Sequence, residues 1–232
     1  MKGSLFMAKK FSENYKRAWV GLYAFLYIPW FLYLEKHVTT DFHLIHVGLD
    51  DKIPFIEFFI VPYLLWFAYI AVTIGYFLLF GKKTEFYRMI TLLFSGMTIF
   101  LIISTLYPNG LNLRPDTFAR DNIFVDMVKN LYATDTSTNV LPSIHVYNSI
   151  AAYLSIANCE KLQKVKWVQI SSLVLTILIV LSTMFLKQHS VVDVIAGCAL
   201  VSVLYILIYK TERTPGKNLS NNLVKIRRLS DN

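Results

Sequence analysis

The sequence predicts an all-α integral membrane protein, a bundle of six transmembrane helices with both termini in the cytoplasm. Three observations predict this fold class. Of the 232 residues, 55% are hydrophobic and only 16% are charged, whereas a soluble domain carries about 25% charged residues. The apolar residues gather in six runs, each close to the length of about 20 residues that a helix needs to cross a bilayer. The basic residues gather on one side of these runs, which predicts their orientation.

The six apolar runs are predicted to be the spanning helices. Basic residues precede the first run, as they do in a signal peptide, but the run is too long for a signal core and lacks a small-residue cleavage pattern. An uncleaved anchor is therefore expected. The second run is long enough to tilt or to begin in the interface. The predicted spans are residues 18–34, 54–80, 89–107, 141–157, 167–186 and 191–209.

Most of the 23 Lys and Arg residues lie in the two tails and in the loops after the second and fourth runs. The side with more basic residues is the cytoplasm. We expect one membrane-embedded domain over residues 1–232, with basic cytoplasmic tails at about 1–17 and 210–232. Topology therefore accounts for the net charge of +8. Because no basic and aromatic groove pattern accompanies that charge, nucleic-acid binding is not expected.

The second outer loop contains a short amphipathic segment at residues 121–131. Its apolar residues recur at helical spacing. They are Ile123, Phe124, Met127, Val128 and Leu131. The pattern favours a short helix that lies in the outer membrane interface. Packing of the same apolar face on the bundle is the alternative that the pattern leaves open.

Polar side chains form three islands that this topology brings to the outer side of the membrane. Arg114 lies in the second outer loop, His145 begins the fourth run, and His189 lies between the fifth and sixth runs. Ionisable groups beside apolar spans are costly to desolvate and often functional. Two histidines and a nearby carboxylate supply a nucleophile, a general acid and an orienting group. This inventory suits phosphoryl transfer through a phosphohistidine.

The spacing within the islands gives each residue a chemical rationale. His189 and Asp193 are four residues apart, so on a helix they share a face. The carboxylate can then fix the imidazole tautomer and leave the other ring nitrogen free to attack phosphorus. The helix that begins near Ser143 can present free amides to phosphate oxygens, with His145 one turn further on. Arg114 and Lys187 are cations suited to the charge of the transferring group.

These residues resemble the three motifs of the type 2 phosphatidic acid phosphatase superfamily of membrane lipid phosphatases. The family's second motif reads Pro-Ser-Gly-His, and the chain has Pro142-Ser143-Ile144-His145. The third reads Ser-Arg, five residues, His, three residues, Asp, and the chain has Ser182-Thr183 followed by His189 and Asp193. The first reads Lys, six residues, Arg-Pro, of which only Arg114-Pro115 remains because Tyr107 takes the Lys position.

The resemblance implies a role for each matched residue. His189 would be the nucleophile, Asp193 its partner, and His145 the acid that protonates the leaving oxygen. Phosphate would be held by Arg114, Ser143, Ser182, Thr183 and Lys187. Thr183 stands at the position of the family's Arg, and Lys187 is a possible substitute for that cation. The order Lys187-Gln188-His189 is similar to the branch of inositol phosphorylceramide synthase-like transferases.

The sequence thus predicts metal-independent hydrolysis of a lipid phosphate monoester or pyrophosphate through a phosphohistidine, at the outer membrane face. Transfer of a phospho-head group to an alcohol is the alternative, and a non-enzymatic membrane protein or transporter is the second. We expect no cofactor and no metal. The expected partners are the lipid phosphate substrate and membrane lipids, with no obligate protein partner. The short loops and the lack of organelle signals favour a bacterial plasma membrane.

Overall fold

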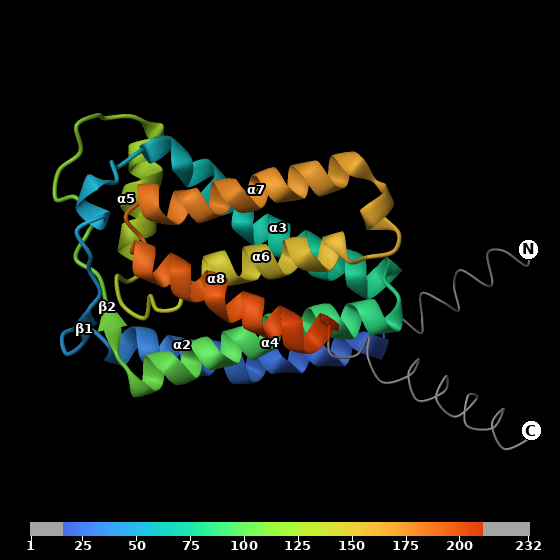
Figure 1. Ribbon diagram of the computed structural model, residues 1–232. Helices are drawn as coiled ribbons and strands as arrows, with labels where there is room; N and C mark the ends of the chain where they lie inside the picture. The colour runs from blue at the N-terminus through green and yellow to red at the C-terminus, as the bar shows by residue number, and fades with distance from the viewer. Residues whose placement is uncertain (1–15, 211–232) are drawn as a thin grey trace, which may run out of the picture.

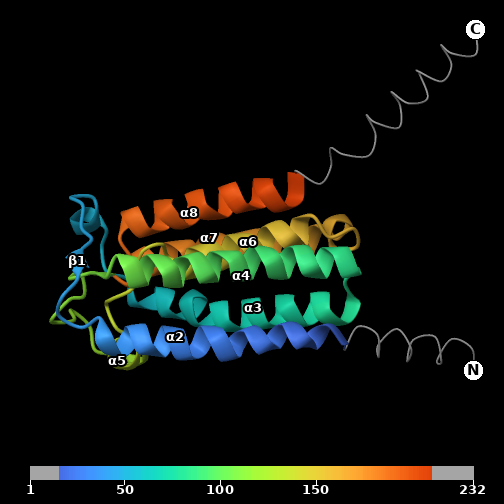
Figure 2. The ribbon, with the colours of Figure 1, turned by 90° about the horizontal axis from the view of Figure 1, so that it is seen from below.

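Long helices run alongside one another through most of the molecule (Figures 1 and 2). The computed structural model describes residues 16–210. The predicted tails lie outside the described residues except for Lys16, Arg17 and Lys210. In chain order the elements are η1 (Lys16–Tyr23), α2 (Ala24–His37), β1 (His43–Leu44), η2 (Asp50–Lys52), η3 (Glu57–Phe59), α3 (Ile60–Phe80), α4 (Lys83–Leu106), β2 (Asn109–Gly110), α5 (Ile123–Thr134), α6 (Ile144–Ala157), η4 (Leu162–Lys164), α7 (Lys166–Phe185), α8 (Val191–Tyr205) and the π-helix η5 (Ile206–Lys210).

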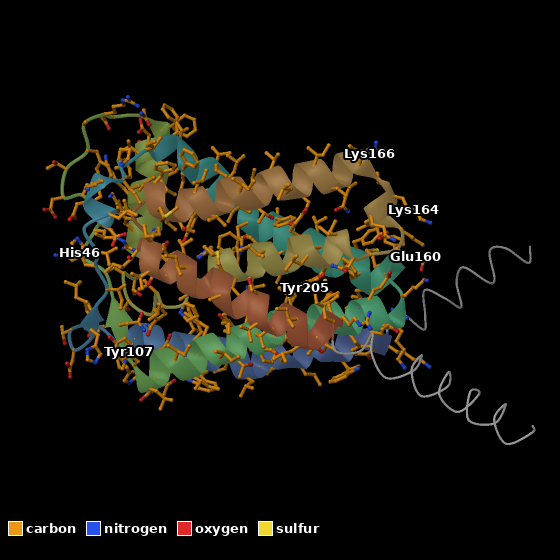
Figure 3. The ribbon with its side chains drawn as sticks, viewed as in Figure 1. His46, Tyr107, Glu160, Lys164, Lys166 and Tyr205 are labelled. Atoms are coloured by element: carbon orange, nitrogen blue, oxygen red, sulfur yellow. The ribbon has the colours of Figure 1, made fainter. Side chains whose placement is uncertain are left out.

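The bundle has two distinct ends. One end, called the α5 end here, carries α5, β1 and β2, and the start of η1 and the end of η5 lie at the opposite end (Figure 1). Among the labelled side chains, His46 and Tyr107 lie at the α5 end, whereas Glu160, Lys164 and Lys166 lie at the opposite end (Figure 3). The loops therefore separate into two groups, as the predicted topology requires.

Within residues 16–210, five helical segments are long and apolar enough to cross a membrane: Lys16–His37, Glu57–Phe80, Lys83–Leu106, Lys166–Phe185 and Val191–Lys210. Large apolar side chains on them face outward, among them Phe25, Val72 and Trp167. Exposed apolar surface on this scale is expected where lipid, not water, is the surrounding solvent. The protein is therefore an all-α integral membrane protein.

The fourth predicted run forms a shorter helix than expected. Helix α6 has 14 residues, which at 1.5 Å per residue is about 21 Å, less than the bilayer core of about 30 Å. It begins at Ile144 because Ser143 is its N-cap, and Pro142 therefore precedes the helix. The predicted number of six spans is not confirmed by length and hydropathy, which support five.

Helix α6 is the centre of the bundle, because it contacts α3, α4, α7 and α8. Its neighbours shield the polar side chains of Asn148, Ser149 and Ser155, which are all buried. Gly96 on α4 leaves room for the ring of Tyr147 on α6, since a Cβ added there would overlap that ring. The Tyr147 hydroxyl donates to the carbonyl of Leu92 at 2.5 Å. Helix α6 is thus held in a fixed position.

The loop between α2 and η3 and the loop between α4 and α6, which are the predicted first and second outer loops, pack on the bundle at the α5 end. Strands β1 and β2 pair in parallel, with His43 opposite Asn109. Helix α5 forms where the amphipathic pattern predicts it, and Asn122 caps it by accepting from the amides of Phe124 and Val125. Its apolar face packs against Ile60, Tyr63 and Leu186. The structure therefore favours the packed alternative for this face, and a location in the lipid interface is not confirmed.

Candidate active site

Helix α6 and helix α8 meet at their N-termini, and this meeting positions both candidate histidines. The Ser143 amide donates to the carbonyl of Asp193 at 3.1 Å. The Ser143 hydroxyl accepts from the amide of Val146 at 3.4 Å, so it caps the helix on which His145 occupies the first turn. Gly197 on α8 supports the approach, because a Cβ there would lie 3.0 Å from the Ser143 carbonyl oxygen.

The tight connection between α7 and α8 presents His189. The amides of Gln188 and His189 both donate to the carbonyl of Thr183, at 2.9 and 3.0 Å. Lys187 has a φ of 54°, a left-handed conformation that is uncommon outside glycine and marks a sharp reversal of the chain. Ser190 then caps α8 together with Asp193, whose Oδ2 accepts from the Ser190 amide at 2.9 Å.

Asp193 lies against one nitrogen of His189, as the spacing predicts. The His189 Nδ1 atom is 3.4 Å from Asp193 Oδ2, and both side chains are buried. This separation is long for a hydrogen bond, and such contacts commonly tighten when substrate binds. The arrangement assigns Nδ1 to the carboxylate and leaves Nε2 as the nitrogen available to a reacting group.

The two histidines face each other across a short gap. Their ring centroids are 5.8 Å apart. Trp66 and Tyr63 on α3 hold the His145 ring, with centroid distances of 4.4 and 4.7 Å. The structure thus brings together two histidines that are distant in sequence, and both of them line one cavity.

Arg114 reaches the same place from the second outer loop. Its guanidinium donates to the carbonyl of Thr136 at 2.9 Å and to Oε1 of Gln188 at 2.8 Å. It also stacks over the ring of Tyr132, 4.5 Å from the centroid. Burial lowers the pKa of Arg114 from its ordinary value, and the nearby charge of Asp135 counteracts that shift. Arg114 therefore orders the residue that precedes the candidate nucleophile.

The remaining predicted phosphate ligands use their polar atoms within the protein. The hydroxyls of Ser182 and Thr183 are buried and donate to carbonyls of their own helix, those of Ile179 and Val180, at 2.7 Å each. The Lys187 ammonium donates to the carbonyls of Asp50 and Ile53 at 2.7 and 2.5 Å, and burial lowers its pKa. Contact of these three side chains with phosphate stays a prediction.

A cavity of about 50 Å³ lies between the histidines and the second outer loop. A volume of this order holds a few water molecules, or a group of comparable size. Several buried polar atoms in and around it have no hydrogen-bond partner in the part of the chain that the structure describes, including Nδ1 of His145, Nε2 of Gln188 and Nε of Arg114. Its lining comprises Phe31, Glu35, Phe100, Asp135, Thr136, Thr138, Asn139, Val140, Ile144, His145, Gln188 and His189.

Four residues of this site were not among those predicted from the sequence: Glu35, Asp135, Asn139 and Gln188. Glu35 lies in the last turn of α2, and a carboxylate at the end of an apolar run was a signal that could have been used. The other three residues lie in polar stretches where helix caps and turns explain the composition equally well. Among residues 16–210 no group of three or more His, Cys, Asp or Glu side chains is arranged to hold a metal ion.

Asp50, in the first outer loop, fastens the N-terminus of α8. Its carboxylate accepts from the Ser190 hydroxyl at 2.7 Å and from the amides of Val191 and Val47 at 2.9 Å each. The side chain is almost fully buried. Because Ser190 directly follows His189, Asp50 positions the turn that carries the candidate nucleophile.

Replacing Asp50 with alanine is expected to lower both stability and turnover. Each buried donor left without an acceptor costs about 1–3 kcal/mol, and loss of a supporting contact typically lowers activity about tenfold to hundredfold. The checks are the Tm of the detergent-purified variant and its kcat. Asp51→Ala is the matched control, since Asp51 is exposed and pairs only with His46 among the described residues. An unchanged kcat in Asp50→Ala would rule out the positioning role.

Comparison with known proteins gives one match. The family model described as PAP2 superfamily matches residues 90–216, which is more than half of the chain and includes all the residues that carry the three motifs. No curated protein and no solved structure matches the chain.

Proposed function

Because the chain belongs to the PAP2 superfamily, which acts on phosphorylated substrates, we propose that it cleaves a lipid phosphate through a phosphohistidine. The substrate class proposed is a lipid phosphate monoester or pyrophosphate. The observation that carries the proposal is the pair of facing imidazoles, with the carboxylate of Asp193 against Nδ1 of His189. This arrangement is what nucleophilic catalysis with a separate general acid requires.

In the first proposed step, His189 Nε2 attacks phosphorus and the bond from phosphorus to the lipid oxygen breaks. His145, protonated before the step, gives its proton to the leaving oxygen, so the lipid alcohol departs neutral. Asp193 stabilises the positive charge on the His189 ring. Gln188 and Arg114 are the proposed donors for the phosphoryl oxygens, because Nε2 of Gln188 and Nε of Arg114 have no partner within the described residues.

In the second proposed step, water attacks the phosphorus and the bond from phosphorus to His189 breaks. His145, neutral after the first step, takes the proton from the water and returns to its starting state. The products are the lipid alcohol and inorganic phosphate, or a lipid monophosphate and phosphate when the substrate is a pyrophosphate. The proton that His145 gives up in the first step is regained in the second, so the complete cycle balances without a cofactor.

We further propose that the α5 end faces the outside of the cell and that α6 completes six membrane crossings in a single domain. The support is the distribution of basic residues, which places the opposite end in the cytoplasm. Helix α6 lies alongside its longer neighbours in the bundle (Figure 1), and the proposed sixth crossing consists of this helix and the segment that leads into it. A bacterial plasma membrane is the proposed location.

Labelling of single cysteines in intact cells tests this orientation. In a chain with Cys159 and Cys198 replaced by alanine, a cysteine at Lys52 is expected to react with a membrane-impermeant maleimide. A cysteine at Lys164 should react only after permeabilisation. Both positions are exposed and lie at opposite ends of the bundle. The reverse pattern of labelling would overturn the proposed orientation.

Transfer to an alcohol is the second candidate, because the same phosphohistidine can pass its group to an alcohol in place of water. The Lys187-Gln188-His189 order favours it, with Gln188 fixed by Arg114 directly beside the nucleophile. A non-enzymatic role or a transport function would not explain why the two histidines face each other. No nucleic acid or obligate protein partner enters either proposal.

A release assay with purified protein tests the proposed function. Phosphatidic acid, lysophosphatidic acid and a polyprenyl pyrophosphate are incubated with the protein, with and without a diacylglycerol or inositol acceptor. Free phosphate is the expected product, whereas phosphorylation of the acceptor, to phosphatidic acid from diacylglycerol or to inositol phosphate from inositol, would instead support transfer. Activity is expected to survive EDTA, since imidazole and guanidinium groups carry out the proposed steps. Loss of activity that added metal restores would contradict the mechanism.

A further inference from the structure

The cavity beside the histidines has an acidic wall that the proposed phosphoryl transfer does not use. Glu35 accepts from the Thr136 hydroxyl at 2.5 Å and from Nδ2 of Asn139 at 3.0 Å. Asp135 accepts from the Tyr63 hydroxyl at 3.3 Å. Both carboxylates line the cavity, and none of its lining residues is Lys or Arg. Two carboxylates repel the phosphate of a substrate that carries no positively charged group.

The acidic wall also contains a buried acceptor with no partner. A carboxylate only accepts hydrogen bonds, so the amide nitrogen of Asn139 must be the atom that faces Glu35. This leaves Oδ1 of Asn139 as the free atom. It has no hydrogen-bond partner within residues 16–210, and the side chain is only 5% exposed. A buried acceptor in this state requires a donor, and Asn139 lines the same cavity.

The opposite wall has the complementary chemistry. A guanidinium only donates hydrogen bonds, so Oε1 of Gln188 must be the atom that faces Arg114. The free atom of Gln188 is therefore Nε2, a donor. The cavity is thus divided into a donor side at Gln188 and the histidines, and an acceptor side at Glu35, Asp135 and Asn139.

We propose that this acceptor side is a subsite for an ammonium group, so that the preferred substrate is a lipid phosphate with an amine close to its phosphorus. The inference rests on the proposed function and adds an amine to its substrate, either on a phosphate monoester or, where the amine lies on the head group, on a phosphodiester. A primary ammonium has three N–H donors, and the subsite supplies three acceptor side chains. The amine can belong to the lipid backbone, as in a long-chain amino alcohol phosphate, or to the head group, as in an ethanolamine phosphodiester.

The electrostatics of Asp135 agree with this geometry. Burial is the main cause that raises the pKa of Asp135, and the charge of Glu35 adds to it. Arg114 and His189 act in the opposite direction without reversing the shift. A positive charge placed between Glu35 and Asp135 relieves their repulsion. A phosphate held at Gln188 then lies beside its own ammonium group, and the charges of the substrate match those of the two walls.

Matched lipids that differ only in the charge of the amine test the subsite. The first pair is 2-aminooctadecyl phosphate and its N-acetyl derivative. The second is dioleoyl phosphatidylethanolamine and its N-acetyl derivative. We expect the wild-type protein to prefer the free amine of one pair about tenfold to hundredfold in kcat/KM, as for a charge-assisted hydrogen bond. The pair that shows the preference identifies whether the amine lies on the backbone or on the head group.

Variants then link the preference to the acidic wall. Glu35→Gln keeps the size of the side chain and removes its charge, so the preference is expected to fall to less than about threefold. Asp135→Asn is a second, independent variant. Asp121→Asn is the control, because Asp121 is exposed in the same outer loop and its removal should leave the preference unchanged. Equal turnover of free and acetylated amines by the wild type, or an unchanged preference in both variants, would overturn the inference.

A binding measurement separates failure of the subsite from failure of the proposed function. Thermal stabilisation of the full-length protein in detergent is compared for 2-aminooctadecanol and its N-acetyl derivative, neither of which carries phosphate. Stabilisation by the free amine alone, lost in Glu35→Gln, supports the subsite even if no lipid phosphate is cleaved, in which case only the proposed function fails. Equal stabilisation by both compounds counts against the subsite whatever the activity.

Discussion

Replacing His189 with alanine is expected to lower kcat at least about ten-thousand-fold, the scale seen when a catalytic nucleophile is removed. The variant should remain folded, because the backbone amide at position 189 still donates to the carbonyl of Thr183, and the lost side chain makes no close hydrogen bond within residues 16–210. Product release from the lipid that the assay identifies gives kcat, and size-exclusion chromatography in detergent confirms the folded state.

His46→Ala is the matched control for this loss. His46 is an exposed histidine at the same end of the bundle, where it pairs with Asp51 at 2.9 Å (Figure 3). Its replacement should leave kcat within about twofold of wild type, as is usual for exposed positions outside a site. A folded His189→Ala protein with full activity would exclude His189 as the nucleophile.

Replacing His145 with alanine is expected to lower kcat by about a hundredfold to ten-thousandfold on a lipid phosphate, the usual contribution of a general acid. The loss should depend on the leaving group. An aryl phosphate releases a phenolate that needs little protonation, so its formation of the phosphoenzyme should be much less affected. The burst of phenolate in the first turnover measures that step separately from hydrolysis by water.

This dependence on the leaving group distinguishes acid catalysis from a structural role. His145 packs between Trp66 and Tyr63, so its removal could also loosen that part of α3. A loosened site would slow both classes of substrate to the same degree. An equal loss on alkyl and aryl esters would therefore contradict the role of His145 as the acid.

The sequence was sufficient to predict the membrane class and the residues at the centre of the site. The membrane class follows from the hydropathy and charge of many residues together, so an atypical residue at one position does not alter the prediction. His189 and Asp193 were predictable because their contact is local, four residues along one helix turn. The pairing of His145 with His189 followed from topology, since spans that alternate in direction return to the same side.

The acidic wall of the cavity and the contact of Asp50 with Ser190 could not be predicted from the sequence. Glu35 meets Asn139 across 104 residues of sequence, and Asp50 meets Ser190 across 140. Nothing local to either residue indicates its partner. The length of α6 was also not predictable, because the helix begins where Ser143 caps it and not where the apolar run begins. Helix α6 is short and partly polar, and it occupies the centre of the bundle because its neighbours bury it. The sequence does not show which helices those neighbours are.

Capture of the covalent intermediate tests the central claim most directly. The protein is mixed with lipid carrying ³²P in its phosphate, quenched within the first turnovers in base, and digested. The account predicts label on the peptide that contains His189, stable in base and lost in acid as expected for a phosphorus–nitrogen bond, with no label in His189→Ala. Lipid cleavage without any labelled peptide, or label on a residue other than His189, would contradict it.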